Sequence, residues 1–416
     1  MGRWPRLLIL AFITYSLAYL DRVNYGFGAA SGLAKSLGIT PNIASLLGAT
    51  FFLGYFFFQI PGGHYAESRS AKRLVFWGLL LWGVFASATG LITNIPLLFV
   101  DRFVLGVVES MVLPAMIVFL SQWFTQGERS RANTVLILGN PVTVLWGSIV
   151  SGYLIAAFDW RWMFIVEGVP SIIWAFAWRA LADDTPGEAR WLPVSERVAL
   201  EERLAAEQRG RDPVPSVGAA LLLPSVILLT VQYFFWSLGV YGFVLWLPSI
   251  IKAGSQQGIV ATGWLSSIPY AAAVIAMLLV SSYSDRSANR RIVVAVSMFV
   301  AAGAFYVSYL LGPGHFGISF VALVIAGAAM YAPYGVFFAM ITDFVPRGVI
   351  GAATALVNSF GALGAFIGAY LVGFLNAATG GPSASFSLMA AALLIAGIIT
   401  LVVRVHGSRA ATTVTT

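Results

Sequence analysis

The sequence predicts an all-α membrane protein with twelve transmembrane helices in two pseudo-symmetric six-helix bundles. The first observation behind this prediction is composition: 59% of the 416 residues are hydrophobic and only 10% are charged. A soluble chain has about 45–50% apolar and about 25% charged residues, so this chain has too few charges to cover a water-exposed surface. The second observation is a series of bilayer-length apolar stretches. The third is a polar motif that occurs once in each half.

A helix needs about 20 apolar residues to cross a bilayer, and twelve stretches approach that length. In the first half they cover residues 7–29, 43–63, 74–93, 96–121, 132–157 and 160–180. In the second half they cover residues 219–250, 258–283, 292–312, 316–342, 348–375 and 383–404. We therefore predict an N-terminal six-helix bundle over residues 1–180 and a C-terminal one over 218–416.

Residues 181–217 form the longest polar segment and are predicted to link the two bundles. The run from Ser195 to Glu207 is rich in Glu, Arg, Ala and Leu, which favours a short amphipathic helix on the surface.

The placement of basic residues predicts the orientation in the membrane. If the N-terminus is cytoplasmic, 19 of the 24 Lys and Arg residues lie in cytoplasmic segments. Only Lys35, Arg161 and Lys252 then lie outside. Cytoplasmic loops carry an excess of Lys and Arg, so we expect both termini and the linker to be cytoplasmic in a multi-pass plasma (inner) membrane protein.

A polar motif follows both the second and the eighth predicted spans. The first copy runs from Gly63 to Arg73 and the second from Ser281 to Arg291. In each copy an acid, Glu67 or Asp285, precedes two adjacent bases by five and six residues. Ordinary basic loops would explain the bases but not the matched acid, so the motif indicates an internal repeat of two halves.

With these loops the chain resembles the major facilitator superfamily, whose signature is G-x-x-x-D-R-x-x-x-R-R. Here Glu67 replaces the Asp, Ser68 the Arg and Ser281 the first Gly. Within the superfamily the chain resembles the anion:cation symporter family of organic-anion/proton symporters. The matching residues are Tyr19 to Asn24, Tyr55, Ile60 to Gly63, Arg102, Gly106, Glu109, Pro114, Trp160 to Phe164, Glu167, Gly168, Asp184 to Pro186 and Ala189 to Leu192. The resemblance implies gating loops that contain Glu67, Arg69, Asp285 and Arg286.

Ionisable residues within or at the edges of the spans all lie in the first half. They are Asp21, Arg22, Asp101, Arg102, Glu109 and Glu167. At about 1.5 Å per residue, Arg22 and Arg102 should lie about 10 Å below the external surface, with Glu109 about 10 Å deeper. Residues seven apart share a helix face, so Arg102 and Glu109 should face the same cavity. We expect Asp101 at the membrane interface and Glu167 in a structural contact.

The resemblance implies that Arg22 binds a substrate carboxylate, for which the guanidinium group is well suited. The alternative is a structural ion pair with an acid on a neighbouring helix. Glu109 is predicted to carry the coupled proton, because burial favours the protonated carboxyl group. Its alternative role is that of a permanently ionised partner of an arginine. Asp21 is either a second proton site or a salt-bridge partner of Arg102.

Other polar groups within the spans are candidates for contacting the rest of the substrate. Tyr19 precedes Arg22 by three residues, and Tyr55 lies in the second span. Asn140 and Asn358 lie mid-span in the fifth and eleventh stretches, which occupy equivalent places in the two halves. Buried amides need partners, so both are predicted to bind substrate. Trp236, Tyr241, Tyr270 and Tyr334 are weaker candidates.

These features predict a proton-coupled importer of a small organic anion by alternating access, favouring a hydroxylated monocarboxylate such as a sugar acid. The alternatives are an aromatic-acid/proton symporter, a drug/proton antiporter and a non-transporting membrane sensor. The chain has no cysteine and only three histidines, and it lacks a phosphate-loop motif. We therefore expect no enzymatic activity, no metal and no cofactor. The expected partners are the anion, protons and membrane lipid, without nucleic acid, for a monomeric protein.

Overall fold

The structure, a computed structural model, describes residues 2–209, 218, 222–287, 289–344 and 350–403. Within these residues it contains 12 helical spans long and apolar enough to cross a membrane, beginning with Arg3–Ala30 and ending with Ser383–Val402. The predicted fold class and the number of spans are therefore confirmed. The predicted bundle boundaries at residues 180 and 218 remain predictions.

The helices of the first half and the linker are α1 (Arg3–Ala30), α2 (Leu33–Ser36), α3 (Pro41–Ser68), α4 (Ala71–Leu91), α5 (Ile95–Ser110), α6 (Val112–Trp123), α7 (Gln126–Ala157), α8 (Trp160–Leu181) and α9 (Val194–Arg209). Those of the second half are α11 (Pro224–Ser255), α12 (Ile259–Ser287), α13 (Arg290–Leu311), α14 (Phe316–Tyr331), α15 (Tyr334–Phe344), α16 (Ile350–Thr379) and α17 (Ser383–Val402). The predicted linker helix from Ser195 to Glu207 is confirmed as α9.

Side-chain caps mark several helix starts. Thr40, Ser70 and Asn94 each accept a hydrogen bond from the backbone N–H three residues ahead. Asp159 accepts from the backbone N–H groups of Arg161 and Trp162. These bonds satisfy N–H groups that the first turn of a helix leaves without partners. The short polar connections between spans therefore determine where each helix begins.

Two predicted spans are each divided into two helices. The fourth is interrupted at Met111, between α5 and α6, and the tenth between α14 and α15. Proline lacks an N–H, and its ring crowds the carbonyl group four residues earlier. Pro114 prevents a helical hydrogen bond to the Ser110 carbonyl, and Pro333 stands at the second interruption. The first break lies two residues after Glu109.

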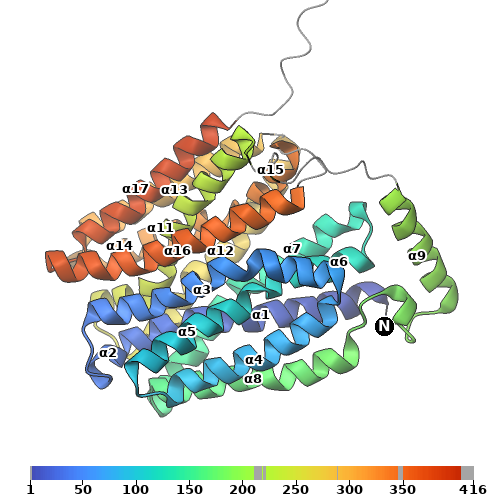
Figure 1. The fold of residues 1–416 in the computed structure, drawn as a ribbon. Coiled ribbons are helices and arrows are strands. Elements are labelled where there is room, and N and C mark those ends of the chain that lie inside the picture. Colours follow the sequence, from blue (N-terminus) through green and yellow to red (C-terminus); the bar gives the residue numbers. More distant parts are fainter. Residues whose placement is uncertain (1, 210–217, 219–221, 288, 345–349, 404–416) are drawn as a thin grey trace, which may run out of the picture.

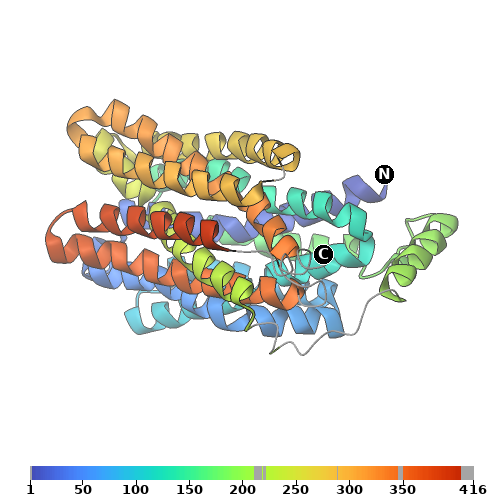
Figure 2. The same ribbon diagram turned by 90° about the horizontal axis from the view of Figure 1, so that it is seen from above.

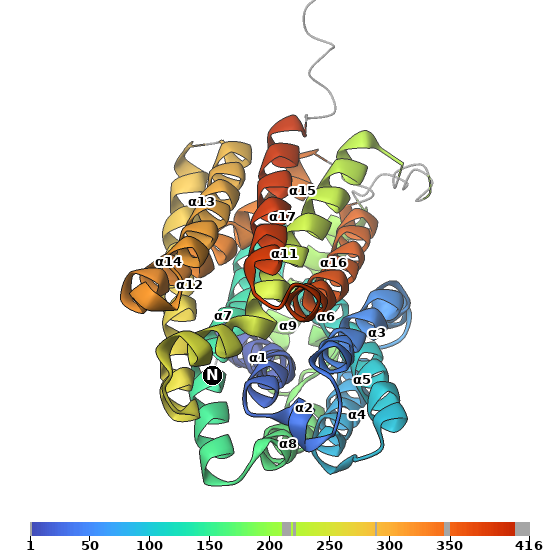
Figure 3. The same cartoon turned by 90° about the vertical axis from the view of Figure 1, so that its left-hand side faces the viewer.

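The two halves lie side by side with α9 and the start of α1 at one end and α2 at the other (Figures 1 and 2). Below, these are called the α9 end and the α2 end. Contacts between the halves run along α3 with α16, α7 with α12, and α1 with α11. Figure 3, viewed along the helices, places α4 and α8 on the outside of one half and α13 and α14 on the outside of the other. The helices of the two halves diverge toward the α9 end (Figure 1).

Close backbone contacts join the halves near the α2 end. A Cβ atom on Gly26 would lie 2.7 Å from the Leu245 carbonyl oxygen, and one on Gly263 would lie 2.6 Å from the Ser148 carbonyl oxygen. The Lys252 Nζ also donates a hydrogen bond to the Ala30 carbonyl at 2.7 Å. These contacts leave no room between the paired helices, so the structure is closed at the α2 end.

Two glycines bring α3 and α5 into direct backbone contact. A Cβ atom on Gly106 would lie 1.9 Å from the Phe51 carbonyl oxygen, and one on Gly54 would lie 2.1 Å from the Phe103 carbonyl oxygen. No other residue type fits at these positions, because small residues are what permit such an approach between membrane helices. The contact places the charged residues of α5 beside the aromatic residues of α3.

The start of the linker is held against the first half near the α9 end. The Trp123 Nε1 donates to the Asp183 carbonyl at 3.0 Å, and the Trp123 and Trp191 rings stack with centroids 5.6 Å apart. The Arg6 guanidinium lies 4.4 Å from the centroid of the Trp191 ring. The segment before α9 is therefore anchored to the bundle by aromatic packing.

Candidate functional site

Six charged side chains are buried among the described residues, and all belong to the first half. They are Asp21, Arg22, Asp101, Arg102, Glu109 and Glu167. Charged groups are costly inside an apolar bundle, so their concentration in one region marks a candidate functional site. This distribution agrees with the sequence prediction. The side chains of Asp285 and Asp343 lie outside the described part of the structure.

Arg22 of α1 and Glu109 of α5 form an ion pair in the interior. The Arg22 Nε and Nη2 atoms lie 2.7 and 2.6 Å from the same oxygen, Oε1 of Glu109. The Glu109 side chain is fully buried and that of Arg22 is 5% exposed. The second carboxylate oxygen, Oε2 of Glu109, has no hydrogen-bond partner. One carboxylate oxygen thus takes both bonds and leaves the other free.

Aromatic side chains surround the Arg22 guanidinium. Its central carbon lies 4.3 Å from the Tyr19 ring centroid and 4.6 Å from that of Tyr55. The Arg22 Nη1 donates to the Tyr241 hydroxyl of α11 at 3.2 Å. Guanidinium groups bind well against aromatic faces. Arg22 therefore lies among groups from α1, α3, α5 and α11, and it bridges the two halves.

Glu109 pairs with Arg22 and not with Arg102. The sequence predicted that Arg102 and Glu109 share one face of a helix. For Arg22 it allowed two partners, a substrate carboxylate or an acid on a neighbouring helix. In the structure the neighbouring acid is present, and it is Glu109. Arg102 lies seven residues before Glu109 on the same helix, which separates them by about 10 Å along the axis. Arg22 of α1 is therefore the closer cation for Glu109.

Arg102 is buried without an ion-pair partner among the described residues. Its guanidinium carbon lies 4.9 Å from the Tyr25 ring centroid and 5.4 Å from that of Phe51. Its Nε and Nη1 atoms make no hydrogen bond. The proposed salt bridge between Asp21 and Arg102 is therefore not formed in this structure, and Arg102 retains free donors beside the site.

Asp21 and Glu167 belong to a second polar group between α1, α7 and α8. The Asn24 amide donates to Asp21 Oδ1 at 3.3 Å, and the Ser151 hydroxyl donates to Glu167 Oε1 at 2.7 Å. Asp21 Oδ2 and Glu167 Oε2 have no partner. The expected structural contact of Glu167 is thus its bond with Ser151.

Asp101 is 3% exposed and accepts a hydrogen bond from the Thr89 hydroxyl at 2.7 Å. It had been expected at the membrane interface, but it lies inside the protein against α4. The position of Asp101 near the start of α5 could not predict this bond, because the Thr89 hydroxyl belongs to the neighbouring helix α4.

The two amides predicted to bind substrate differ in their surroundings. Asn358 of α16 exchanges hydrogen bonds with Gln59 of α3. Its side-chain amide donates to the Gln59 side-chain oxygen, and the Gln59 amide donates to the Asn358 backbone carbonyl at 3.3 Å. Asn140 of α7 is 3% exposed, and its Oδ1 has no partner. Asn140 thus offers a free acceptor, whereas Asn358 is occupied in a bond between the halves.

The predicted gating residues Glu67, Arg69 and Arg286 are exposed and are not brought together. The loop between α3 and α4 instead contacts the linker. Asp184 accepts hydrogen bonds from the Ser70 hydroxyl at 2.5 Å and from the Lys72 N–H at 2.8 Å. The sequence did not predict this contact, although the loop belongs to the repeated motif from Gly63 to Arg73 and Asp184 begins the motif from Asp184 to Pro186.

The structure adds Gln59 and Tyr241 to the residues around the site. Gln59 was not singled out from the sequence, and Tyr241 was only one of several weak aromatic candidates. A mid-span Gln is itself a signal, because an amide in an apolar span needs a partner. Among the described residues, no group of three His, Asp or Glu side chains is placed to hold a metal ion.

The Arg22–Glu109 pair predicts a specific pattern of stability. Arg22→Met leaves the Glu109 carboxylate buried without its cation, and we expect a loss of about 3–5 kcal/mol at neutral pH. Adding Glu109→Gln should recover most of that loss. Thermal and denaturant unfolding of the purified variants measure both effects.

Lys72→Met serves as the control for this experiment. Lys72 lies 3.7 Å from Asp183 in a pair whose side chains are 26% and 23% exposed, so its removal should cost about 0–1 kcal/mol. If Arg22→Met and the double variant are equally destabilised, the guanidinium stabilises through packing and not through its charge.

Comparison with known proteins identifies the family. The chain matches the Major Facilitator Superfamily over residues 11–262 and 253–415. It is 30% identical over 405 residues to a candidate tartrate transporter of Agrobacterium vitis, covering 95% of this chain and 89% of the relative. It is 28% identical over 408 residues to the quinolone resistance transporter of Acinetobacter baumannii, covering 96% of this chain and 92% of the relative.

A solved structure supports the same fold. It is a bacterial homologue of the human lysosomal transporter Spinster, with a TM-score of 0.75, 15% identity and 97% coverage of each chain. Together with the twelve spans and the family match along nearly the whole chain, this shows that the protein belongs to the major facilitator superfamily of secondary transporters and is not an enzyme.

Proposed function

We propose that the protein is a proton-coupled symporter that imports a small organic anion, preferably a hydroxylated monocarboxylate, by alternating access. The observation that carries this proposal is the Arg22–Glu109 pair, buried where the two halves meet and held by one carboxylate oxygen. An arginine in this place has a carboxylate partner already and is able to exchange it for another.

Protonation of Glu109 is the step that couples the proton to the anion. A protonated carboxyl group no longer compensates the Arg22 charge, so the guanidinium becomes free to bind a substrate carboxylate through two parallel hydrogen bonds. When Glu109 loses its proton, the Arg22–Glu109 ion pair forms again and the substrate carboxylate is released. The unpartnered Oε2 of Glu109 is the atom that would receive the proton.

The surroundings of Arg22 favour a hydroxylated substrate. Tyr19, Tyr55 and Tyr241 lie against the guanidinium. Asn140 of α7 has a free acceptor, and we propose that it also contacts the substrate. Such groups hydrogen-bond to substrate hydroxyls, and a buried polar group left without a partner disfavours an analogue that lacks them. The relatedness to a candidate tartrate transporter, named for a hydroxylated acid, supports this class.

Alternating access would be achieved by rocking of the two halves, residues 1–180 and 218–416, about the site. The excess of Lys and Arg in the loops at the α9 end supports cytoplasmic termini, which makes the closed α2 end external. In this orientation the site would open toward the cytoplasm. Arg22–Tyr241 and Gln59–Asn358 are bonds between halves that this motion would change.

Two other substrates have specific support. The tyrosines around Arg22 would also suit an aromatic acid. The relatedness to a quinolone resistance transporter favours drug/proton antiport. Competition separates the three: we expect unlabelled sugar acids to inhibit uptake of a labelled sugar acid more strongly than benzoates or quinolones do. Efflux of a quinolone against a proton gradient, without sugar-acid uptake, would replace the proposal with antiport.

Arg22→Lys tests the carboxylate site. Lysine keeps the charge but loses the planar pair of donors, so the apparent affinity for the anion should fall about tenfold to a hundredfold, as expected for a lost hydrogen bond between charged groups. Uptake into liposomes as a function of anion concentration measures it. Arg190→Lys, at an exposed linker residue, is the control. An unchanged affinity in Arg22→Lys would remove Arg22 from the substrate site.

Glu109→Gln tests the proton carrier. The variant resembles the protonated state, so uptake driven by a pH gradient should be lost while exchange of bound anion across the membrane continues. Counterflow and gradient-driven uptake in the same liposomes measure the two activities. Glu167→Gln, which alters a buried acid bonded to Ser151, should retain gradient-driven uptake. Normal accumulation by Glu109→Gln would refute the coupling role.

The number of protons determines whether transport responds to voltage. Four acids and two arginines are buried in the described part of the first half, and of these acids only Glu109 is paired with an arginine. If Asp21 and Glu109 both carry protons, one net positive charge enters with each monoanion, and 100 mV contributes about 2.3 kcal/mol. We expect an inside-negative potassium-diffusion potential to accelerate uptake without a pH gradient. Uptake that ignores the sign of the potential would limit coupling to Glu109.

A further inference from the structure

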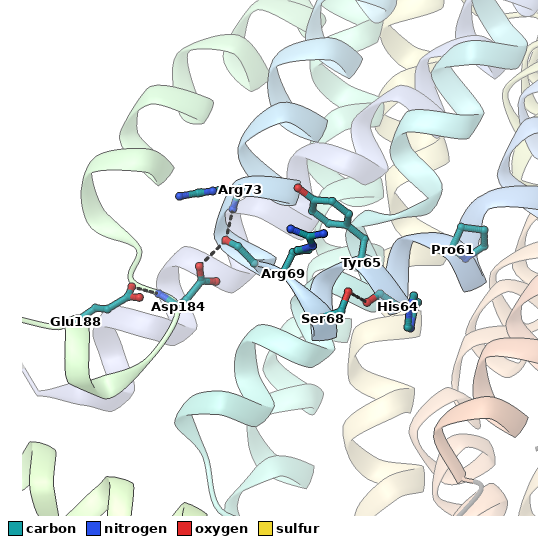
Figure 4. Close-up of a pocket in the computed structure, with 9 residues that line it drawn as sticks. Pro61, His64, Tyr65, Ser68, Arg69, Arg73, Asp184 and Glu188 are labelled. Carbon is teal, nitrogen blue, oxygen red and sulfur yellow. Dashed lines mark hydrogen bonds between the residues drawn. The ribbon is translucent and has the colours of Figure 1, made fainter.

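A hollow of about 610 Å³ lies at the α9 end of the first half, away from the Arg22 site. It is bounded by the end of α3, the start of α4 and the linker (Figure 4). The residues that line it are Pro61, His64, Tyr65, Ser68, Arg69, Ser70, Arg73, Asp184 and Glu188. Two of these residues are arginines, and both are exposed.

The acids of the hollow are already engaged, and the arginines are not. Asp184 accepts from the Ser70 hydroxyl and the Lys72 N–H at the start of α4, and Glu188 accepts from the Asp184 N–H at 3.3 Å. The described residues offer neither Arg69 nor Arg73 a hydrogen bond or an ion pair for its guanidinium group. The hydrogen-bond donors that remain free in the hollow therefore belong to its two arginines, which favours a ligand with anionic oxygen atoms.

An apolar groove of about 160 Å³ adjoins this hollow along α4. It is lined by Leu74, Val75, Trp77, Gly78, Leu81, Val108, Met111 and Val112. Residues four apart share a helix face, so Arg73, Trp77 and Leu81 follow one another along the same side of α4. Trp77 is 55% exposed and Leu81 is 41% exposed. One outward-facing surface thus joins two arginines to a groove without charge.

We propose that this surface is a binding site for an anionic phospholipid, with the phosphate group between Arg69 and Arg73 and one acyl chain in the groove. Guanidinium groups bind phosphate oxygens through paired hydrogen bonds. A soluble phosphate would contact the arginines alone, whereas a phospholipid would also fill the apolar groove with an acyl chain. The combination of the two surfaces selects the lipid, and it does not depend on which solute is transported.

The site is tested by lipid titration of the full-length protein in detergent, followed by native mass spectrometry. Phosphatidylglycerol is compared with phosphatidylcholine of the same acyl chains, and with free glycerol phosphate. We expect phosphatidylglycerol to bind more tightly than phosphatidylcholine. Arg69→Gln/Arg73→Gln should weaken phosphatidylglycerol binding about fivefold for each arginine, the effect typical of a basic residue at an anionic lipid surface.

Matched variants separate the charged part from the apolar part. Arg286→Gln alters an exposed arginine in the equivalent loop of the second half and should leave binding unchanged. Gly78→Leu fills the groove, since a Cβ atom there has only ordinary contact with Val112 at 3.8 Å. It should weaken the binding of both lipids, whereas Gly303→Leu, at an open position on α13, should not.

Three results would overturn the proposal. They are equal retention of phosphatidylglycerol and phosphatidylcholine, equal losses in Arg286→Gln and the double arginine variant, and displacement of the lipid by an equal concentration of glycerol phosphate. The last result would identify a site for soluble phosphates. Thermal unfolding of each variant shows that a lost lipid is not the result of a lost fold.

Discussion

The structure depends on how a guanidinium group and carboxyl groups are accommodated in an apolar bundle. Each would be strongly disfavoured alone, because removing an ion from water costs more than most folding contacts return. Arg22 and Glu109 compensate each other's charge at 2.6 Å, and their side chains are only 5% and 0% exposed. The remaining acids depend on neutral donors, such as Thr89 for Asp101 and Ser151 for Glu167. A bundle arranged in this way responds to protons and to anions, because either one changes the charge that must be compensated.

The packing around the Arg22–Glu109 pair depends largely on glycine and proline, which have no ionisable or hydrogen-bonding side chain. Gly54 and Gly106 let α3 and α5 touch, and the proline after Glu109 ends the first segment of the fourth span. As a result Phe51 lies within cation–π distance of both Arg22 and Arg102, at 5.7 and 5.4 Å. The arginines share an aromatic wall while only one of them has an acid. This asymmetry leaves Arg102 with free donors close to the site.

The two halves contribute unequally to the site. All the buried charges described belong to the first half, and the second half supplies two neutral side chains, Tyr241 and Asn358. Tyr241 accepts a hydrogen bond from the Arg22 guanidinium, and Asn358 is hydrogen-bonded to Gln59. A hydrogen bond to a neutral side chain is weaker than an ion pair and is therefore easier to exchange during a conformational change. Closure at the α2 end relies on backbone contacts at glycines and on the hydrogen bond from Lys252 to the Ala30 carbonyl, and neither needs an acid as partner.

The sequence alone determined the class of the protein, the number of its spans and the half that carries the charges. These properties follow from composition and from the length of apolar runs, which do not depend on neighbours. The sequence also predicted that Tyr19, Tyr55 and Arg22 contact the same substrate, and in the structure the two tyrosine rings lie against the Arg22 guanidinium.

Only the tertiary structure decided which groups are partners. Helical periodicity shows that Arg102 and Glu109 share a face, but it does not show that α1 approaches α5 closely enough for Arg22 to take the carboxylate. The bond between Gln59 and Asn358 joins residues on α3 and α16, and the contact of Asp184 with the start of α4 joins the linker to a distant loop. Such pairings depend on the distance between helices, and that distance is set by side-chain volume at many positions simultaneously, which no local pattern in the sequence records.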